Sequence, residues 1–125
     1  IEQCVRTDEK GKPAVTRYQT ISTGNHQGKR YSLLDISLET GRTHQIRAHF
    51  SHLGHPLLGD DLYGPPRKEN DPILRQALHA YKILLTQPWK NGELLSLTAP
   101  PPEDLQNLID LLFPQTELNK LYESR

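Results

Sequence analysis

Residues 40–60 carry the clearest helix signal in the chain, and this signal constrains what the flanking segments can form. Three apolar residues recur on one helical face: Ile46, Phe50 and Leu53. Thr40 or Thr43 can cap the helix, because a threonine oxygen accepts a free backbone N–H of the first turn. Gly54 predicts the helix end, and Pro56 follows two residues later. We therefore predict one short helix with a core-facing apolar stripe.

The segment before this helix predicts an antiparallel pair of strands. Residues 1–12 are polar and are predicted to be a lead-in and a turn. Residues 14–22 are rich in β-branched and aromatic residues, and residues 30–39 alternate apolar and polar side chains. The apolar residues of the second strand are expected on a buried face: Leu34, Ile36 and Leu38. A loop at 23–29 is short enough to close a hairpin.

The segment after the helix predicts a second hairpin and a helical end. A loop through residues 60–72 comes first. The elements that follow are a strand over 78–87 that Pro88 ends, a turn at Asn91–Gly92, a strand over 94–98, a helix over 103–113 and a polar helix over about 116–124. This order predicts an α+β fold with a mostly antiparallel mixed sheet and few helices.

Composition limits the class of protein. The 125 residues predict a single domain, and the net charge is zero, so any basic site must be local. The one cysteine, Cys4, cannot close an intrachain disulfide, which fits a reducing, cytoplasmic compartment. No apolar run approaches the ~20 residues of a membrane span. The chain begins at Ile1 and contains no Met, so we expect it to be a piece of a longer protein.

The histidines of residues 40–60 invite comparison with a metal site, but their spacing argues against one. A metalloprotease helix places two histidines at i and i+4 with a glutamate between them. Here His44 and His49 are five residues apart, and no Asp, Glu or Cys lies near His49 and His52 as a third ligand. The adjacent Asp60 and Asp61 are interpreted as turn formers. No nucleophile elbow, phosphate loop or dinucleotide-binding glycine pattern occurs.

A local positive potential remains the main chemical signal. No acidic residue separates Glu39 from Asp60, while Arg42 and Arg47 lie between them. Arginines beside the free amides of a helix start suit phosphate and base edges. On physical grounds alone this indicates a weak anion or RNA site, and a solvated helix face remains the alternative.

The residues themselves carry a more specific signal. Residues 38–50, 53–60 and 62–64 closely resemble the RluA-type pseudouridine synthases, and so do residues 75–80 and the strand that contains Ala14-x-Thr16-x-Tyr18. This resemblance implies an enzyme that isomerises uridine to pseudouridine in structured RNA, either ribosomal or transfer RNA, without a cofactor or metal. It further implies the C-terminal half of a catalytic domain, here residues 1–125.

The resemblance also implies roles for individual residues. Arg47 matches the catalytic arginine that pairs with an essential aspartate, and Leu78 matches an apolar position that lines the pocket. Four residues match the motif's entrance and are expected to contact RNA or support the pocket: Arg42, Thr43, His44 and Gln45. The essential aspartate belongs to a motif resembling His-Arg-Leu-Asp, and the base-stacking tyrosine has a motif of its own; neither motif occurs here.

These departures lead to three expectations. Arg47 should be exposed or bound to an anion or a neighbouring chain, because its partner is absent. The chain alone should be inactive, and an exposed sheet edge should let it self-associate. Two other hypotheses remain open: a non-catalytic RNA-binding module that keeps the cleft, and a small histidine-based metalloprotein.

Overall fold

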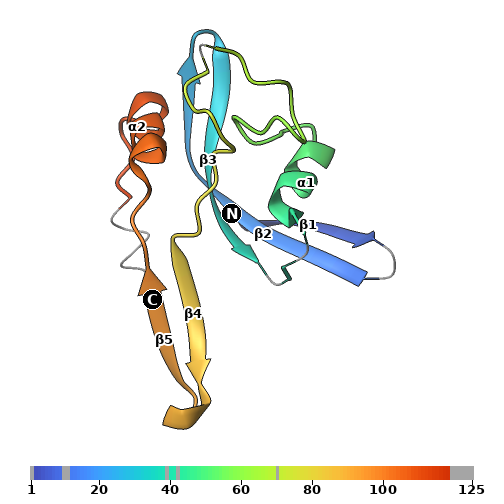
Figure 1. Ribbon diagram of the computed structural model, residues 1–125, viewed down its shortest axis with the longest axis vertical. Helices are drawn as coiled ribbons and strands as arrows, with labels where there is room; N and C mark the ends of the chain where they lie inside the picture. Colours follow the sequence, from blue (N-terminus) through green and yellow to red (C-terminus); the bar gives the residue numbers. More distant parts are fainter. Residues whose placement is uncertain (1, 10–11, 39, 42, 70, 119–125) are drawn as a thin grey trace.

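The structure is a computed structural model that describes residues 2–9, 12–38, 40–41, 43–69 and 71–118. Its elements in chain order are β1 (Glu2–Glu9), β2 (Lys12–His26), β3 (Lys29–Leu38), α1 (Gln45–His52), β4 (Lys82–Gln87), a 3₁₀ turn (Pro88–Lys90), β5 (Glu93–Thr98) and α2 (Glu103–Leu112). The α+β class is confirmed (Figure 1). The described strands form two antiparallel sheets rather than one mixed sheet.

The first sheet has the order β1-β2-β3. The prediction that residues 1–12 are a lead-in is wrong, because β1 pairs with the first half of β2 from Glu2 to Glu9. Its sequence is polar, and the strand exists through backbone pairing that no local pattern reveals. The buried face predicted for β3 is only partly present, since Leu38 is 49% exposed.

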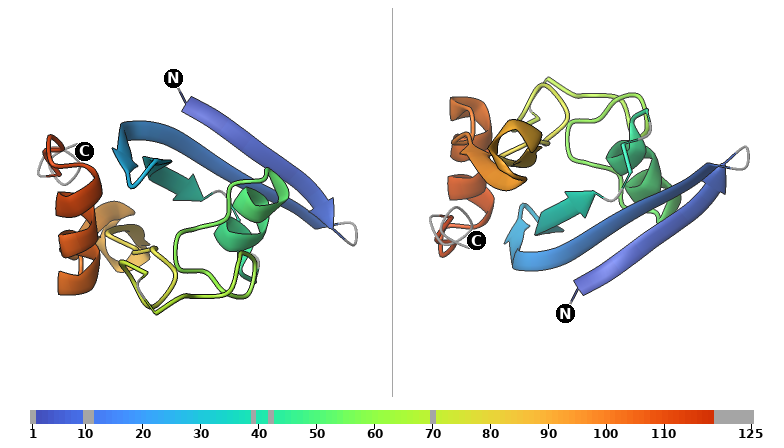
Figure 2. Two further views of the ribbon diagram at one scale, coloured as in Figure 1. Left: turned by 90° about the horizontal axis from the view of Figure 1, so that it is seen from above. Right: turned by 90° about the horizontal axis from the view of Figure 1, so that it is seen from below.

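Strand β2 lies between β1 and β3 and contacts both helices. A register shift between Thr20 and Ser22 marks a bulge where the strand bends. Helix α1 packs against β1 and β2, and α2 packs near the far end of β2, where Gly24 lies against Leu112. The two helices therefore lie toward opposite ends of this long strand (Figure 2).

Helix α1 ends where the sequence predicted, but neither Thr40 nor Thr43 caps its start. The N-cap is His44, in the left-handed conformation with φ 49°, and no side-chain cap bond forms there. The helix ends at His52, and Gly54 takes φ 85°, as a glycine stop requires. Phe50 is buried, and its ring packs edge-on against Tyr18 with the ring centres 5.1 Å apart. Leu53 is exposed, so the buried apolar stripe is shorter than predicted.

Helix α2 supplies most of the hydrophobic core. The predicted apolar face is confirmed: Leu105, Leu108, Ile109 and Leu112 are buried with Ile73 and Phe113. Arg75 donates to the Asp104 carboxylate at 2.8 and 3.0 Å and lowers its pKa, which ties the segment before β4 to the first turn of α2. The predicted final helix falls mostly outside the described residues. None of the helices described is long and apolar enough to cross a membrane.

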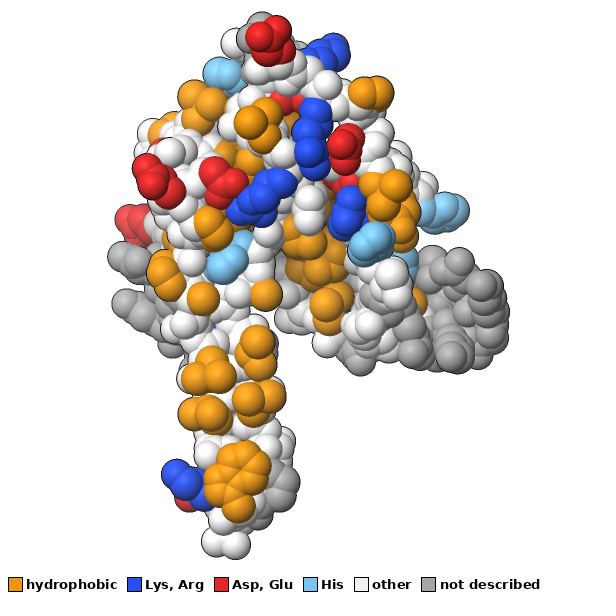
Figure 3. All heavy atoms as spheres, in the orientation of Figure 1, with side chains coloured by type: hydrophobic (Ala, Val, Ile, Leu, Met, Phe, Trp, Pro, Cys, Tyr) orange, Lys and Arg blue, Asp and Glu red, His pale blue; other side chains and the backbone are white. Residues whose placement is uncertain are grey.

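The β4–β5 hairpin projects away from the rest of the chain (Figure 1). Asn91 and Gly92 both have positive φ, which confirms the predicted turn. The strand itself begins at Lys82, later than predicted. Six apolar residues of the hairpin are 37–67% exposed: Ile83, Leu84, Leu85, Leu94, Leu95 and Leu97. Figure 3 shows a run of hydrophobic side chains along one face of the hairpin.

Candidate functional site

Arg47 and Asp60 form the central ion pair of residues 40–60. The guanidinium Nε donates to Asp60 Oδ2 and Nη2 donates to Oδ1, both at 2.8 Å. The side chains are 14% and 0% exposed, respectively. The expectation that Arg47 is exposed or bound to something outside this chain is therefore wrong. The chain turns back after α1, with Gly54 and Gly59 at positive φ, and returns an acid to the helix that precedes it.

Asp60 is also the turn former that its sequence context predicted. Its Oδ1 accepts the backbone N–H groups of Leu62 and Tyr63, both at 3.1 Å. The hydrogen bonds from Arg47 lower the pKa of Asp60 to about 2, against the opposing effect of burial. The same pairing raises the pKa of Arg47. Asp60 is thus a fixed, ionised carboxylate that satisfies both a loop and an arginine.

Tyr63 covers one side of Arg47. The guanidinium carbon lies 5.4 Å from the centre of the tyrosine ring, within range of a cation–π contact. The tyrosine hydroxyl shares a 3.2 Å hydrogen bond with His44 Nδ1. Ser51 Oγ donates to the Tyr63 carbonyl at 2.6 Å, which fastens this loop to α1. A cation, a phenol and an imidazole are thereby gathered at the start of α1.

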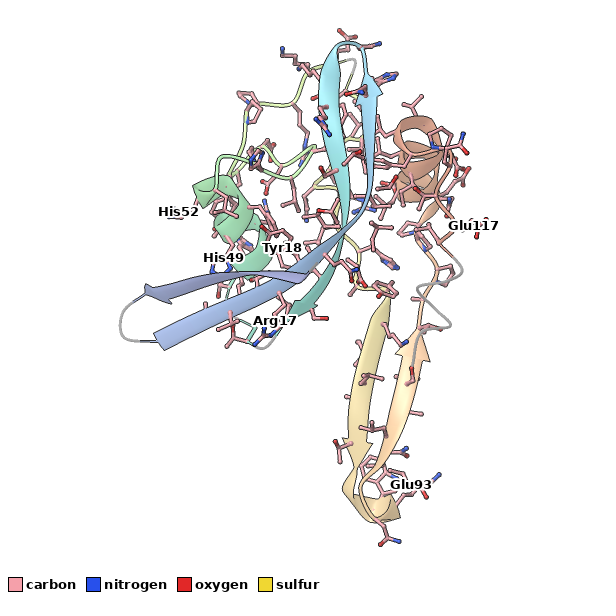
Figure 4. All side chains as sticks on the ribbon, turned by 180° about the vertical axis from the view of Figure 1, so that it is seen from behind. Arg17, Tyr18, His49, His52, Glu93 and Glu117 are labelled. Carbon is pink, nitrogen blue, oxygen red and sulfur yellow. The ribbon has the colours of Figure 1, made fainter. Side chains whose placement is uncertain are left out.

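The opposite face of α1 is anchored to β2 by a buried polar network. Gln45 Nε2 donates to the Val15 carbonyl and to Thr16 Oγ1, both at 2.9 Å. Thr16 Oγ1 also shares a 2.7 Å hydrogen bond with His49 Nδ1. His49 is buried beside the sheet (Figure 4), and this burial, with a smaller effect of His52, lowers its pKa.

Thr40 extends this network instead of capping the helix. Its hydroxyl donates to Gln45 Oε1 at 2.6 Å and accepts the backbone N–H of Val15 at 3.0 Å. The cap prediction for this residue is wrong, because the hydroxyl forms hydrogen bonds to Gln45 of α1 and to Val15 of β2 instead. The amide of Gln45 therefore has partners at both its nitrogen and its oxygen.

The predicted entrance residues are not equivalent. Arg42 lies outside the described residues. Thr43 and His44 are exposed, whereas Gln45 is buried, so its contacts favour a supporting role over direct RNA contact. Leu78 is partly buried, and its carbonyl accepts a hydrogen bond from Arg75 at 3.3 Å. No hydrogen bond or ring contact among the described residues links Leu78 to Arg47.

Sequence reasoning missed Tyr63 and the partnership of Asp60 with Arg47. The signal was available, since Asp60 and Tyr63 both belong to the stretches that carry the resemblance. The histidines of residues 40–60 do not form a cluster. In the part of the chain that the structure describes, no three His, Cys, Asp or Glu side chains are grouped to hold a metal.

Comparison with known proteins gives a consistent result. Residues 1–52 match the family described as RNA pseudouridylate synthase. The chain is 45% identical over 113 residues to the ribosomal large subunit pseudouridine synthase D of Haemophilus ducreyi, covering 82% of this chain and 33% of that protein. It is 48% identical over 96 residues to an uncharacterized RNA pseudouridine synthase of Chloroflexus aurantiacus, covering 77% of this chain and 28% of the relative.

A solved structure shares the fold. The human RNA pseudouridylate synthase domain-containing 1 aligns with a TM-score of 0.67 at 23% identity, over 98% of this chain and 58% of that one. The chain spans about a third of the length of the curated relatives it matches. The resemblance is thus confirmed over most of the residues: this chain is a segment homologous to the RNA pseudouridine synthases.

Proposed function

We propose that this chain is the C-terminal part of the catalytic domain of an enzyme that converts uridine to pseudouridine in ribosomal RNA of the large subunit. The observation that carries the proposal is 45% identity over 82% of the chain to a protein named for that activity. The names of several bacterial relatives favour ribosomal over transfer RNA. We place the enzyme in the cytoplasm, where bacterial ribosomal RNA is made.

The geometry at the start of α1 supports this function. Arg47 is ordered by Asp60, and the exposed His44 lies edge-on to Tyr63 with ring centres 5.7 Å apart. Single-stranded RNA is recognised by cations at its phosphates and by aromatic rings and arginine planes at its bases. In Figure 3 basic and histidine side chains lie on the face above the hairpin, interspersed with acidic and apolar side chains.

The residues of this chain are proposed to have separate roles in the enzyme. Arg47 provides the cation of the catalytic centre, Leu78 an apolar wall, and Arg42, Thr43 and His44 the RNA contacts, with Gln45 behind them. The essential aspartate that the resemblance implies is supplied by sequence outside these 125 residues. On this proposal the chain alone is one partial domain, without turnover.

Tritium release from RNA labelled at uridine C5 tests the proposal. The full-length protein that carries this chain should release tritium from a large-subunit ribosomal RNA transcript, and the 125 residues alone should not. Arg47→Ala should abolish release, whereas Arg30→Ala, at an exposed arginine of β3, is the matched control. Failure of the full-length protein to release tritium from ribosomal or transfer RNA would refute the function.

One alternative has its own observation. A non-catalytic RNA-binding module would keep the exposed His44 and the half-buried Tyr63 but lack the essential aspartate. The coding sequence upstream of Ile1 separates the two. An in-frame motif like His-Arg-Leu-Asp supports the enzyme, whereas full-length protein that binds RNA without releasing tritium supports the module.

A further inference from the structure

We propose that Asp60 is a positioning residue, which holds the Arg47 guanidinium so that its Nη1 edge is presented to an incoming oxyanion, either a carboxylate or a phosphate. The identity of the reaction rests on the proposed function, but the geometry stands by itself. Of the two residues of this ion pair, the resemblance assigns a role to Arg47 and none to Asp60.

The hydrogen bonds of Arg47 leave one edge of the guanidinium available. A guanidinium can pair with two oxyanions along different edges, because its donors point outward in one plane. Asp60 takes the edge formed by Nε and Nη2. Among the described residues, none accepts a hydrogen bond from Arg47 Nη1. Asp60 therefore holds the guanidinium in a defined orientation and leaves its Nη1 donors for another acceptor.

Tyr63 restricts movement of the guanidinium perpendicular to its plane. Its ring lies against one face of the planar group, 5.4 Å from the guanidinium carbon. The tyrosine is held by its own N–H on Asp60 and by Ser51 Oγ on its carbonyl. With one edge bonded and one face covered, rotation about the terminal bonds of Arg47 is opposed by contacts on two sides.

The carboxylate that does the holding is itself immobile. Asp60 is 1% exposed and accepts hydrogen bonds from two backbone amides as well as from Arg47. The preceding Gly59 packs so closely on the Arg75 backbone that an added Cβ would lie 2.1 Å from that carbonyl oxygen. The loop is thus fixed against the rest of the fold, and Asp60 on this loop fixes the guanidinium.

A double-mutant cycle in the full-length protein tests this inference. The variants are Asp60→Asn, Arg47→Lys and both together, with Asp61→Asn as a control at a neighbouring exposed aspartate. We expect Asp60→Asn to lower kcat per folded molecule at least about tenfold with little change in KM, as a misplaced catalytic group does. In the Arg47→Lys background the same change should have almost no further effect. Additive losses would overturn the inference, since a general structural defect would persist in both backgrounds.

A second measurement does not depend on activity. NMR of arginine-labelled protein should resolve separate Nη resonances for Arg47 in the wild type, because rotation about the Nε–Cζ bond is slowed. These resonances should average in Asp60→Asn and stay resolved in Asp61→Asn. If Asp60→Asn fails to fold, Asp60→Glu keeps the charge and shifts the carboxylate by one methylene, and partial averaging is expected. An Arg47 group that is equally restrained without the Asp60 carboxylate would refute the proposal.

If the wild type releases no tritium but shows the restrained arginine, only the proposed function fails. If the wild type is active and Asp60→Asn is equally active, only the positioning role fails.

Discussion

Replacing Asp60 by asparagine should destabilise the fold in a pH-dependent way. The change keeps the side-chain size but removes the negative charge and places an amide N–H₂ group against the donors of Arg47. Arg47 and the backbone amides of Leu62 and Tyr63 all donate to this carboxylate, which is fully buried. Loss of the charge therefore weakens a helix contact and a loop contact together.

The size of the effect follows from the pKa of Asp60. Its lowering from 3.8 to about 2 corresponds to roughly 2 kcal/mol of unfolding free energy at neutral pH. The ionised form is favoured in the folded state, so this contribution is complete above the unfolded pKa and is lost as the pH falls toward 2. About 1 kcal/mol of it should already be lost at pH 3.

Urea unfolding of the chain, followed by circular dichroism, measures this contribution. The difference between the wild type and Asp60→Asn should be largest at pH 6 and should shrink on acidification to pH 3. Asp61→Asn is the matched control: its carboxylate is 49% exposed and 3.3 Å from Arg67, so it should cost at most ~0.5 kcal/mol. A difference for Asp60→Asn that equals the control, or that stays constant with pH, would refute the reasoning.

Three further predictions concern other parts of the fold. Gly24→Ala should destabilise the chain by about 1–3 kcal/mol in urea titrations, because the new Cβ would lie 2.0 Å from the Leu112 carbonyl oxygen; Gly41→Ala, which meets open space, should cost far less. Burial lowers the pKa of His49, so the unfolded state binds its proton more readily, and stability should fall as the pH drops below about 6.5; His49→Gln should remove that dependence. The chain alone should bind the dye ANS and elute from a sizing column at a concentration-dependent volume, and Leu94→Lys on the hairpin should reduce both effects.

The parts of the fold that the sequence predicted are those set by local periodicity. The apolar face of α2 follows from spacing within one helix, so it could be predicted residue by residue. The Asn91–Gly92 turn follows from two residues that tolerate positive φ. Strand β1 could not be predicted, because its formation depends on a partner strand and not on its own polar sequence.

The candidate site shows the same limit. The resemblance singled out Arg47 as the chemical centre of residues 40–60, and its role in catalysis stays a prediction. Asp60, its partner within the chain, was predicted only as a turn former. The pairing with Asp60 depends on the loop that returns the chain to α1. Gly54 was predicted as the helix stop, but nothing in the sequence predicted the positive φ of Gly59. Gln45 was expected at an RNA-facing entrance, yet its amide is buried and donates to the Val15 carbonyl and the Thr16 hydroxyl.

Helix geometry explains why the histidine-rich pattern and the arginine have separate roles. Gln45 and His49 are four residues apart, so they share one face of α1, and both are buried against β2. Arg47 is two residues from each, about 200° around the helix axis, and must therefore leave from the other side. One short motif thus contributes an anchor to the sheet and a cation to the site. Substitutions on the anchor face should lower stability first and activity as a consequence, whereas substitutions of Arg47 should lower activity in a protein whose anchor to β2 is intact.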